Sequence, residues 1–181
     1  SSPFDKTAVD LLEDLKAPAY KIASFEINDI ELIDYVASKG KPIILSTGVA
    51  TLVDIQLAIE TCKKAGNNEI ILLKCTSSYP APLEDANLKM IQKYSKDFNV
   101  ITGLSDHTIG DTCTIAAVSL GARVIEKHFI LDRKMGGPDA SFSMNPKEFS
   151  KMVKSIREVE KALGKIDYNL IENQIKGKVF S

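Results

Sequence analysis

The chain has 181 residues, of which 44% are hydrophobic and 26% charged, and its formal net charge is -1. This is the composition of a globular protein with enough apolar side chains for a sizeable core, and it excludes an intrinsically disordered chain. The near-zero net charge argues against nucleic acid or an anionic membrane as a partner, because both require a basic surface.

The cysteines, the apolar runs and the N-terminus bear on the cellular compartment of the protein. Cys62, Cys75 and Cys113 are odd in number and lack metal-ligand spacing, which favours a reducing compartment over a disulfide scaffold. We interpret Cys75, which follows apolar residues, as a core thiol. No apolar run approaches the roughly 20 residues of a membrane span, and the N-terminus lacks signal-peptide features. The sequence opens on Ser1, which we interpret as a processed chain or an excised fragment.

Short apolar runs alternate with amphipathic stretches along the whole chain. The runs predicted to be strands are residues 19–24, 42–47, 69–76, 98–104 and 122–130. The predicted helices are residues 7–15, 29–39, 52–65, 83–96, 111–120 and 146–163. Asn145 and Pro146 predict the cap and first residue of the last helix. Strands that alternate with helices predict βαβ units and a parallel sheet.

The number of units predicts the fold class. After an initial helix we count five strand–helix units, whereas a complete (β/α)8 barrel needs about 250 residues. We therefore expect an α/β fold that forms the C-terminal part of a TIM barrel. Residues 169–181 are polar and basic without clear periodicity, which is typical of a linker.

Polar residues follow each apolar run, and in a barrel these strand ends converge on one mouth, where active sites lie. The sets are Lys21, Ser24 and Glu26; Ser46 and Thr47; Thr76, Ser77 and Tyr79; Ser105, Asp106 and His107; and Glu126 and His128, followed by the loop that contains Asp139. Lysine, hydroxyls and helix N-termini suit an anionic substrate such as a phosphate ester.

The two histidines carry the strongest chemical signal. Each has a carboxylate one or two residues before it, and imidazole is a common ligand of divalent transition metals. The alternative is a pair of core histidines satisfied by backbone hydrogen bonds. Because Glu126 and His128 are two residues apart, we expect both to face the barrel interior and Lys127 to face outward, in an ion pair with an acidic side chain. Lys21 and Ser24 have opposite parity, so both reach the mouth only if their strand ends near Ala23.

The strand-end segments resemble those of sialic acid synthases, in the same order and over nearly the whole chain. The matching segments are Tyr20-Lys-Ile-Ala-Ser24, Lys41-Pro-Ile-Ile-Leu-Ser-Thr-Gly48, Cys75-Thr-Ser-Ser-Tyr-Pro-Ala-Pro82, Leu104-Ser-Asp-His-Thr-Ile-Gly110 and Val124-Ile-Glu-Lys-His-Phe129. Within that family, residues 76–82 and 136–143 look most like pseudaminic acid synthases.

The resemblance implies condensation of phosphoenolpyruvate with an open-chain acylamino sugar and water, releasing phosphate and a nonulosonic acid. For pseudaminic acid the sugar is 2,4-diacetamido-2,4,6-trideoxy-altrose. It implies that His107 and His128 hold a divalent metal, usually manganese, with magnesium or cobalt as alternatives. By position it places Lys21, Ser24, Ser46 and Ser105 at phosphoenolpyruvate, Tyr79 in the segment that lines that pocket, and Glu26 and Asp139 near the acceptor sugar. From their place at the strand ends we further predict that Thr47, Thr76 and Ser77 bind substrate, and we predict catalytic roles for Glu126, Lys21 and Asp106.

The family pattern also implies parts that this sequence lacks. The first barrel strands carry a glutamate and a lysine of the site. A C-terminal antifreeze-like (SAF) domain contributes an arginine to the partner's site in a domain-swapped homodimer. We therefore expect residues 1–168 to be an incomplete synthase domain, inactive alone and prone to self-association through its open sheet edges, and residues 169–181 to begin the linker. The resemblance implies a bacterial, cytoplasmic setting.

Three other functions remain open at this point. An N-acetylneuraminate synthase would differ only in using N-acetylmannosamine. A metal-dependent barrel aldolase would produce pyruvate without releasing phosphate. A non-catalytic sugar-phosphate-binding module would bind manganese weakly or not at all.

Overall fold

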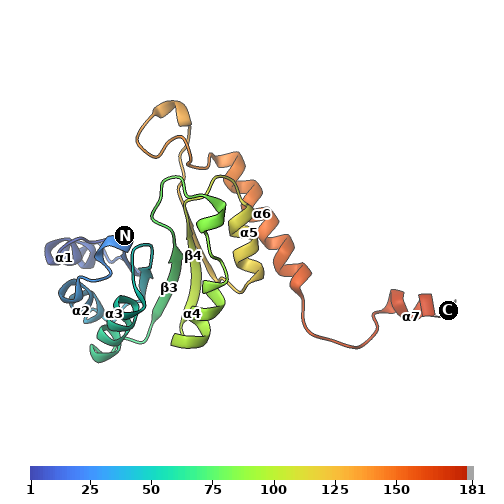
Figure 1. The fold of residues 1–181 in the computed structure, drawn as a ribbon, viewed down its shortest axis with the longest axis horizontal. Coiled ribbons are helices and arrows are strands. Elements are labelled where there is room, and N and C mark those ends of the chain that lie inside the picture. The colour runs from blue at the N-terminus through green and yellow to red at the C-terminus, as the bar shows by residue number, and fades with distance from the viewer. Residues whose placement is uncertain (179–181) are drawn as a thin grey trace.

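The computed structural model describes residues 1–178 and contains a five-stranded parallel sheet whose strands are ordered as in the sequence. The strands are β1 (Tyr20–Ile22), β2 (Ile43–Ser46), β3 (Ile70–Cys75), β4 (Ile101–Asp106) and β5 (Val124–Lys127). Every connection between them carries a helix (Figure 1). Consecutive order without reversal is the winding of a barrel, so the predicted partial (β/α)8 barrel of five units is confirmed.

The first six helices cover the outer face of this sheet, and side-chain caps mark the starts of four of them. The helices are α1 (Lys6–Asp14), α2 (Ile30–Ala37), α3 (Leu52–Lys64), α4 (Met90–Phe98), α5 (Thr112–Ser119), α6 (Pro146–Leu163) and α7 (Glu172–Lys178). Asn145 caps α6 and forms a capping box with Glu148, with Pro146 in the first turn as predicted. Within residues 1–178, no helix combines the length and apolarity needed to cross a membrane.

The apolar core lies mainly between the sheet and these helices. Its largest cluster joins β1, β2 and β3 to α1, α2 and α3 through fully buried residues such as Ile22, Leu45 and Leu72. A smaller cluster holds α5 and α6 together around Met152. Because side chains alternate along a strand, filling the outer face with apolar residues leaves the intervening positions to face the barrel interior.

The largest difference from the prediction lies between β3 and β4. Residues 83–85 form only a single 3-10 turn, and α4 begins at Met90, because Asn87 adopts a left-handed backbone conformation (φ 45°) that no α-helix accommodates. Asn99, also left-handed, ends the helix. Phe98 is therefore the last residue of the helix, and β4 runs two residues further than predicted, to Asp106.

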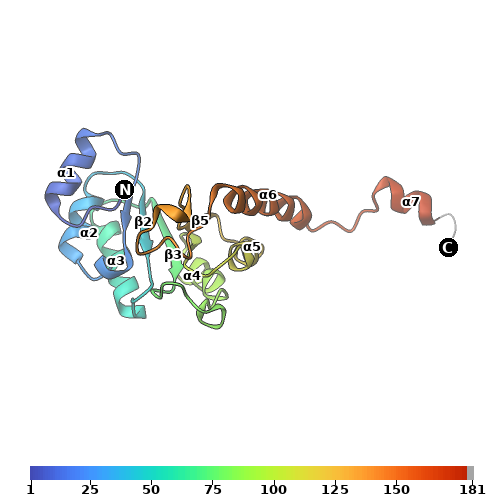
Figure 2. The ribbon, with the colours of Figure 1, turned by 90° about the horizontal axis from the view of Figure 1, so that it is seen from above.

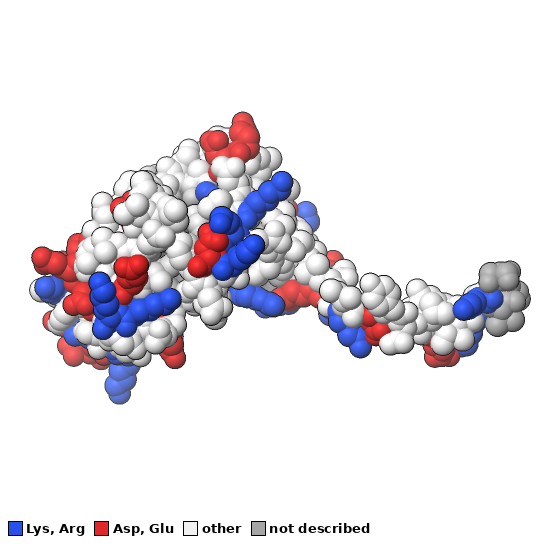
Figure 3. All heavy atoms as spheres, turned by 60° about the horizontal axis from the view of Figure 1, so that its bottom comes forward, with Lys and Arg blue, Asp and Glu red and all other residues white. Residues whose placement is uncertain are grey.

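The C-terminal segment leaves the body of the molecule. Residues 164–171 extend away from α6, and α7 lies apart from the barrel (Figures 1 and 2). Ile166 and Tyr168 are 96% and 98% exposed. The predicted linker therefore contains a short helix, and its last three residues, 179–181, fall outside the described residues. On the face shown in Figure 3, acidic and basic side chains are interspersed.

Gly103 in β4 gives a testable consequence of strand packing. A Cβ at this position would lie 2.1 Å from the Val124 carbonyl oxygen and 2.7 Å from a methyl group of Leu73. Because backbone of the neighbouring strand cannot rotate away, we expect Gly103→Ala to lower the free energy of unfolding by at least about 2 kcal/mol. Urea unfolding measures this. Gly177→Ala is the matched control, since nothing lies within 4 Å of that position, and equal midpoints for the two variants would contradict the expectation.

Candidate active site

The inner face of the sheet ends in polar side chains, which together form what we call the mouth. Strand register places Cys75 beside Ser105 and Ser105 beside Glu126, so these residues share the inner face. Lys21, beside Ile44, and Ser46, beside Leu73, belong to the same face. Beyond the strand ends, the mouth also contains His107, His128, Ser24, Ser77 and Tyr79.

The ring of His107 has a defined tautomer. Its Nδ1 lies 2.8 Å from the Thr76 carbonyl oxygen, which can only accept, so Nδ1 carries the proton and Nε2 is left with its lone pair. The Tyr79 ring lies against it, with 4.2 Å between centroids. Burial disfavours the charged ring, but hydrogen bonds with Cys75 and the Thr76 carbonyl outweigh burial and raise the pKa of His107.

His128 lies next to His107, with ring centroids 5.2 Å apart. Its Nδ1 is 3.4 Å from Asp139 Oδ2, and the buried Phe142 ring packs against it at 5.1 Å. Burial, and after it the charge of His107, lower the pKa of His128, which favours the neutral form that a metal ligand requires. The 136–143 loop thus orients the second histidine.

Glu126 connects the two sides of the mouth. Its Oε1 accepts a hydrogen bond from Ser105 Oγ at 2.7 Å. Lys21 Nζ, which comes from β1 at the other edge of the sheet, lies 3.6 Å from the same oxygen. The predicted parity is confirmed, because Glu126 faces inward while Lys127 faces the helices and pairs with Asp106 at 2.8 Å. The lysine of the mouth therefore has one carboxylate as its counterion.

Ser24 reaches the mouth because β1 ends at Ile22, which meets the condition set by parity. Its Oγ accepts a hydrogen bond from the Gly48 backbone N–H at 3.0 Å and lies 3.4 Å from Cys75 Sγ. Gly48 has no room for a side chain, since a Cβ would lie 2.1 Å from Ser77 Oγ. The glycine therefore lets two hydroxyls approach the same point.

Three buried polar atoms of the described residues lack a hydrogen-bond partner, and all three belong to residues predicted to bind substrate. They are Glu26 Oε2, Ser46 Oγ and Ser77 Oγ. Buried polar groups are almost always paired, so such atoms call for a partner outside the protein chain. A polar ligand in the mouth is one source of those partners.

Three predicted site residues direct their side chains elsewhere. Thr47 Oγ1 donates to the Leu73 carbonyl on the outer side of the sheet, and Thr76 Oγ1 donates to the Asp85 carbonyl. The Asp106 carboxylate is 1% exposed and accepts from Lys127, Thr108 and Thr114. The prediction that these three side chains face substrate is corrected, because strand parity turns Thr47 and Asp106 outward and a local bond turns Thr76 away.

Sequence reasoning missed Cys75 and Phe142 as parts of the site. Cys75 is buried as expected, but its Sγ faces the mouth, 3.9 Å from His107 Nδ1. Burial tends to raise the pKa of this thiol, whereas hydrogen bonds with His107 and Ser24 lower it below its usual value. Inward parity with Ser105 could have identified Cys75, whereas nothing local to Phe142 indicates its contact with His128.

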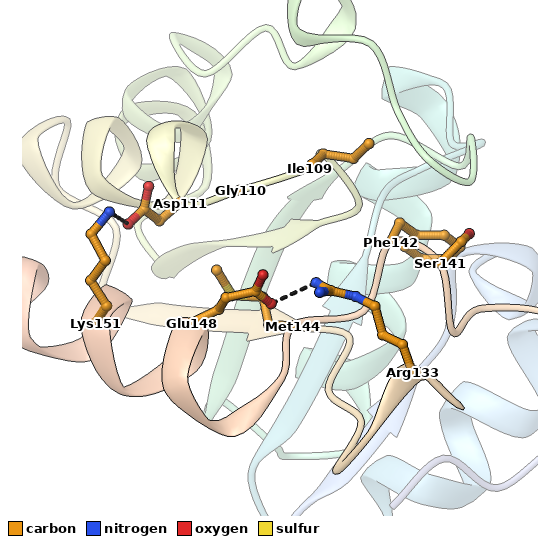
Figure 4. Close-up of a pocket in the computed structure, with 9 residues that line it drawn as sticks. All are labelled: Ile109, Gly110, Asp111, Arg133, Ser141, Phe142, Met144, Glu148 and Lys151. Atoms are coloured by element: carbon orange, nitrogen blue, oxygen red, sulfur yellow. Dashed lines mark hydrogen bonds and ion pairs between the residues drawn. The ribbon is translucent and has the colours of Figure 1, made fainter. Parts of the chain in front are cut away.

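A separate pocket adjoins the mouth on the far side of Phe142, between α5 and the start of α6 (Figure 4). Its four charged side chains form two ion pairs, Arg133 with Glu148 at 2.5 Å and Lys151 with Asp111 at 3.9 Å. Both cations of this pocket therefore have a carboxylate partner.

The donor set fits a divalent metal in part. Neighbouring imidazoles, one with its Nε2 available and the other tending to neutrality, are suitable ligands. Within residues 1–178, no group of three or more His, Cys, Asp and Glu side chains is arranged to hold a metal ion. A metal at the two histidines would therefore need water or substrate oxygens to complete its coordination.

Comparison with known proteins places these residues in a family. The sequence model of the NeuB family matches residues 1–168. A pseudaminic acid synthase of Helicobacter pylori is 52% identical over 164 residues, covering 91% of this chain and 48% of that protein. An N,N'-diacetyllegionaminic acid synthase of Campylobacter jejuni is 45% identical over 166 residues, covering 91% of this chain and 50% of that protein.

A solved structure has a similar fold. The N-acetylneuraminic acid synthetase of Leptospira borgpetersenii, in complex with citrate, superposes with a TM-score of 0.92 at 35% identity, covering 99% of this chain and 62% of that one. The chain spans about half the length of the curated relatives described above.

Proposed function

The chain belongs to the NeuB family, and on that basis we propose that its mouth condenses phosphoenolpyruvate with an open-chain acylamino sugar. Water is the third reactant, and the products are a nonulosonic acid and inorganic phosphate. Similarity to enzymes named as synthases of pseudaminic, diacetyllegionaminic and N-acetylneuraminic acids supports this reaction class.

The observation that carries the proposal is the set of unpaired buried polar atoms at residues predicted to bind substrate. Ser46 Oγ, Ser77 Oγ and Glu26 Oε2 have no partner within the described residues, and Lys21 shares the inner face of the sheet with Ser46. Hydroxyls and a lysine suit the phosphate and carboxylate of phosphoenolpyruvate, while a carboxylate suits the hydroxyls of a sugar. Substrate would supply the partners that the protein lacks.

His107 and His128 are the residues that would hold a divalent metal, for which we propose manganese. When bound, such an ion polarises an aldehyde oxygen as a Lewis acid. The chain's own contribution is orientation: the Thr76 carbonyl fixes the His107 tautomer, and Asp139 and Phe142 fix the plane of His128. Glu126 holds Lys21 in place through its carboxylate.

For the acceptor we propose 2,4-diacetamido-2,4,6-trideoxy-altrose, the precursor of pseudaminic acid. Support comes from the 45–52% identity to pseudaminic acid synthases of Helicobacter pylori and Campylobacter jejuni, against 40–45% to N,N'-diacetyllegionaminic acid synthases. The loop that contains Asp139 and Phe142 contacts His128, so differences in this loop would bear on which acceptor the mouth takes. N-Acetylmannosamine, the precursor of N-acetylneuraminic acid, is the runner-up.

The test is a chimera in which this chain replaces the matched segment of the Helicobacter pylori synthase. We expect manganese-dependent release of phosphate from phosphoenolpyruvate with the diacetamido sugar and not with N-acetylmannosamine. Release with N-acetylmannosamine alone would keep the reaction class and reject the acceptor. A folded chimera that releases no phosphate with either sugar, while the parent enzyme is active, would reject the proposed function.

Gly48 provides a sharper probe of the anion site. In Gly48→Ala the added Cβ would lie 2.1 Å from Ser77 Oγ and 2.7 Å from Ser24 Oγ, so both hydroxyls must rotate away. We expect the KM for phosphoenolpyruvate in the chimera to rise about tenfold, the cost of roughly one hydrogen bond. Steady-state phosphate release measures it, with Gly177→Ala as the control. An unchanged KM would show that the two hydroxyls do not bind this substrate.

A further inference from the structure

Strands β4 and β5 are joined by two pairs of side chains on opposite faces of the sheet. Register places Ser105 beside Glu126 and Asp106 beside Lys127. The Ser105–Glu126 pair lies in the mouth. The Asp106–Lys127 pair lies on the outer face, immediately before the two histidines in sequence.

The outer pair is shut away from solvent. The Asp106 and Lys127 side chains are 1% and 2% exposed, and Lys127 Nζ lies 2.8 Å from Asp106 Oδ2. Lys127 also donates to the Thr108 carbonyl at 2.6 Å, which ties β5 to the segment that follows His107. Lys127, the residue before His128, therefore contacts both Asp106 and Thr108, which are the residues on either side of His107.

Asp106 extends the same network to α5. Its carboxylate accepts from the Thr108 backbone N–H at 2.9 Å, from the Thr108 hydroxyl at 2.8 Å and from the Thr114 hydroxyl at 2.9 Å. Each carboxylate oxygen therefore has two donors. Nothing of this carboxylate is left for a substrate, so its effect on the mouth must pass through the backbone.

Stability alone is a weak reason for such a pair. Removing two charges from water costs about as much as their mutual attraction returns, and apolar or neutral replacements of both partners are often tolerated. What a saturated network of this kind supplies is a single arrangement of the groups that it joins. The groups joined here are the strand ends that carry His107 and His128.

We propose that the Asp106–Lys127 pair is a positioning device that sets the spacing of His107 and His128. This inference rests on the proposed function for its consequence, which is affinity for a divalent metal. Replacement of residues that orient the ligands of a metal typically lowers metal affinity by about 10- to 100-fold.

The test is the neutral pair Asp106→Asn with Lys127→Met, which keeps the shape of both side chains. We expect the dissociation constant for Mn²⁺ to rise about 10- to 100-fold, while the thermal midpoint stays within about 5 °C of wild type. The chain has two histidines, so the Cε1–H resonances can be assigned by single replacements. The Tyr79 ring, 4.2 Å from His107, makes the resonance of that histidine sensitive to displacement.

The two readouts separate this inference from the proposed function. If wild type binds no Mn²⁺, the metal site is rejected, and the histidine resonances of the metal-free chain still decide the positioning role. If the neutral pair folds with wild-type resonances, and with wild-type affinity where Mn²⁺ binds, the positioning role is overturned. If the neutral pair fails to fold, Thr114→Val is the second variant, because it removes only the hydrogen bond from α5 to Asp106. We expect its affinity for Mn²⁺ to fall about threefold and its histidine resonances to shift. Unchanged histidine resonances in this variant would overturn the inference.

Discussion

Replacement of Lys127 by alanine is expected to lower the free energy of unfolding by about 3–5 kcal/mol. The substitution leaves the Asp106 carboxylate, 1% exposed, without its charged partner, and leaves the Thr108 carbonyl without the donor at 2.6 Å. The buried carboxylate then keeps only the neutral donors of Thr108 and Thr114, which replace neither its solvation nor the charge of Lys127. Equilibrium urea unfolding of the isolated chain, followed by circular dichroism, gives the value.

Lys154→Ala is the matched control for this loss. Lys154 pairs with Glu158 at 4.0 Å along the exposed side of α6, where its side chain is 81% exposed. Exposed pairs of this kind contribute less than about 1 kcal/mol. A cost below about 1 kcal/mol for Lys127→Ala as well would mean that the Asp106–Lys127 pair is solvated in solution and that the packing around it is looser than described.

Replacement of Glu126 by glutamine is expected to lower turnover in the chimera by about 100-fold, which is close to 3 kcal/mol of transition-state stabilisation. Glutamine keeps the shape and can still accept from Ser105, but it removes the charge that faces Lys21 at 3.6 Å. A lysine without its counterion moves, and a group that must hold a phosphate or carboxylate loses its position. Phosphate release at saturating substrates measures the effect.

The control here is Glu160→Gln, because Glu160 pairs with Arg157 on the solvent-exposed surface of α6. We expect its turnover to match that of the unaltered chimera. If Glu126→Gln lowers turnover by less than threefold, Glu126 does not organise the mouth and its contact with Lys21 is incidental.

The fold was predictable because apolar runs and helix caps are local signals. Alternation identified the five strands, and the Asn145–Pro146 pair located the start of α6 to the residue. The error between residues 83 and 96 arose where backbone conformation overrode an amphipathic pattern. Asn87 and Asn99 are both left-handed, and asparagine tolerates that conformation without requiring it, so the sequence does not specify where the helix starts.

The site was predictable where strand parity applies and not where it fails. Parity correctly separated Glu126 from Lys127, two neighbours with opposite directions. Applied to every strand, it would also have turned Thr47 and Asp106 outward and Cys75 inward. The contact of Phe142 with His128 joins a loop to a strand end, and no local pattern encodes it.

Several expectations stay predictions. The domain-swapped homodimer, the cytoplasmic setting and the choice of manganese over magnesium or cobalt depend on the family resemblance. The same holds for the domain boundary at residue 168, which coincides with the end of the match to the family. The metal is the most decisive of these, because the geometry of the mouth centres on the two imidazoles.

The most direct test of the account is therefore a Mn²⁺ titration of the chain, followed by the electron paramagnetic resonance signal of the free ion. We compare wild type with His107→Ala, His128→Ala and the double variant, each checked for unchanged circular dichroism. We predict one bound ion per chain in wild type and a loss of affinity of at least about 100-fold in each single variant. Equal affinity in wild type and the double variant would contradict it.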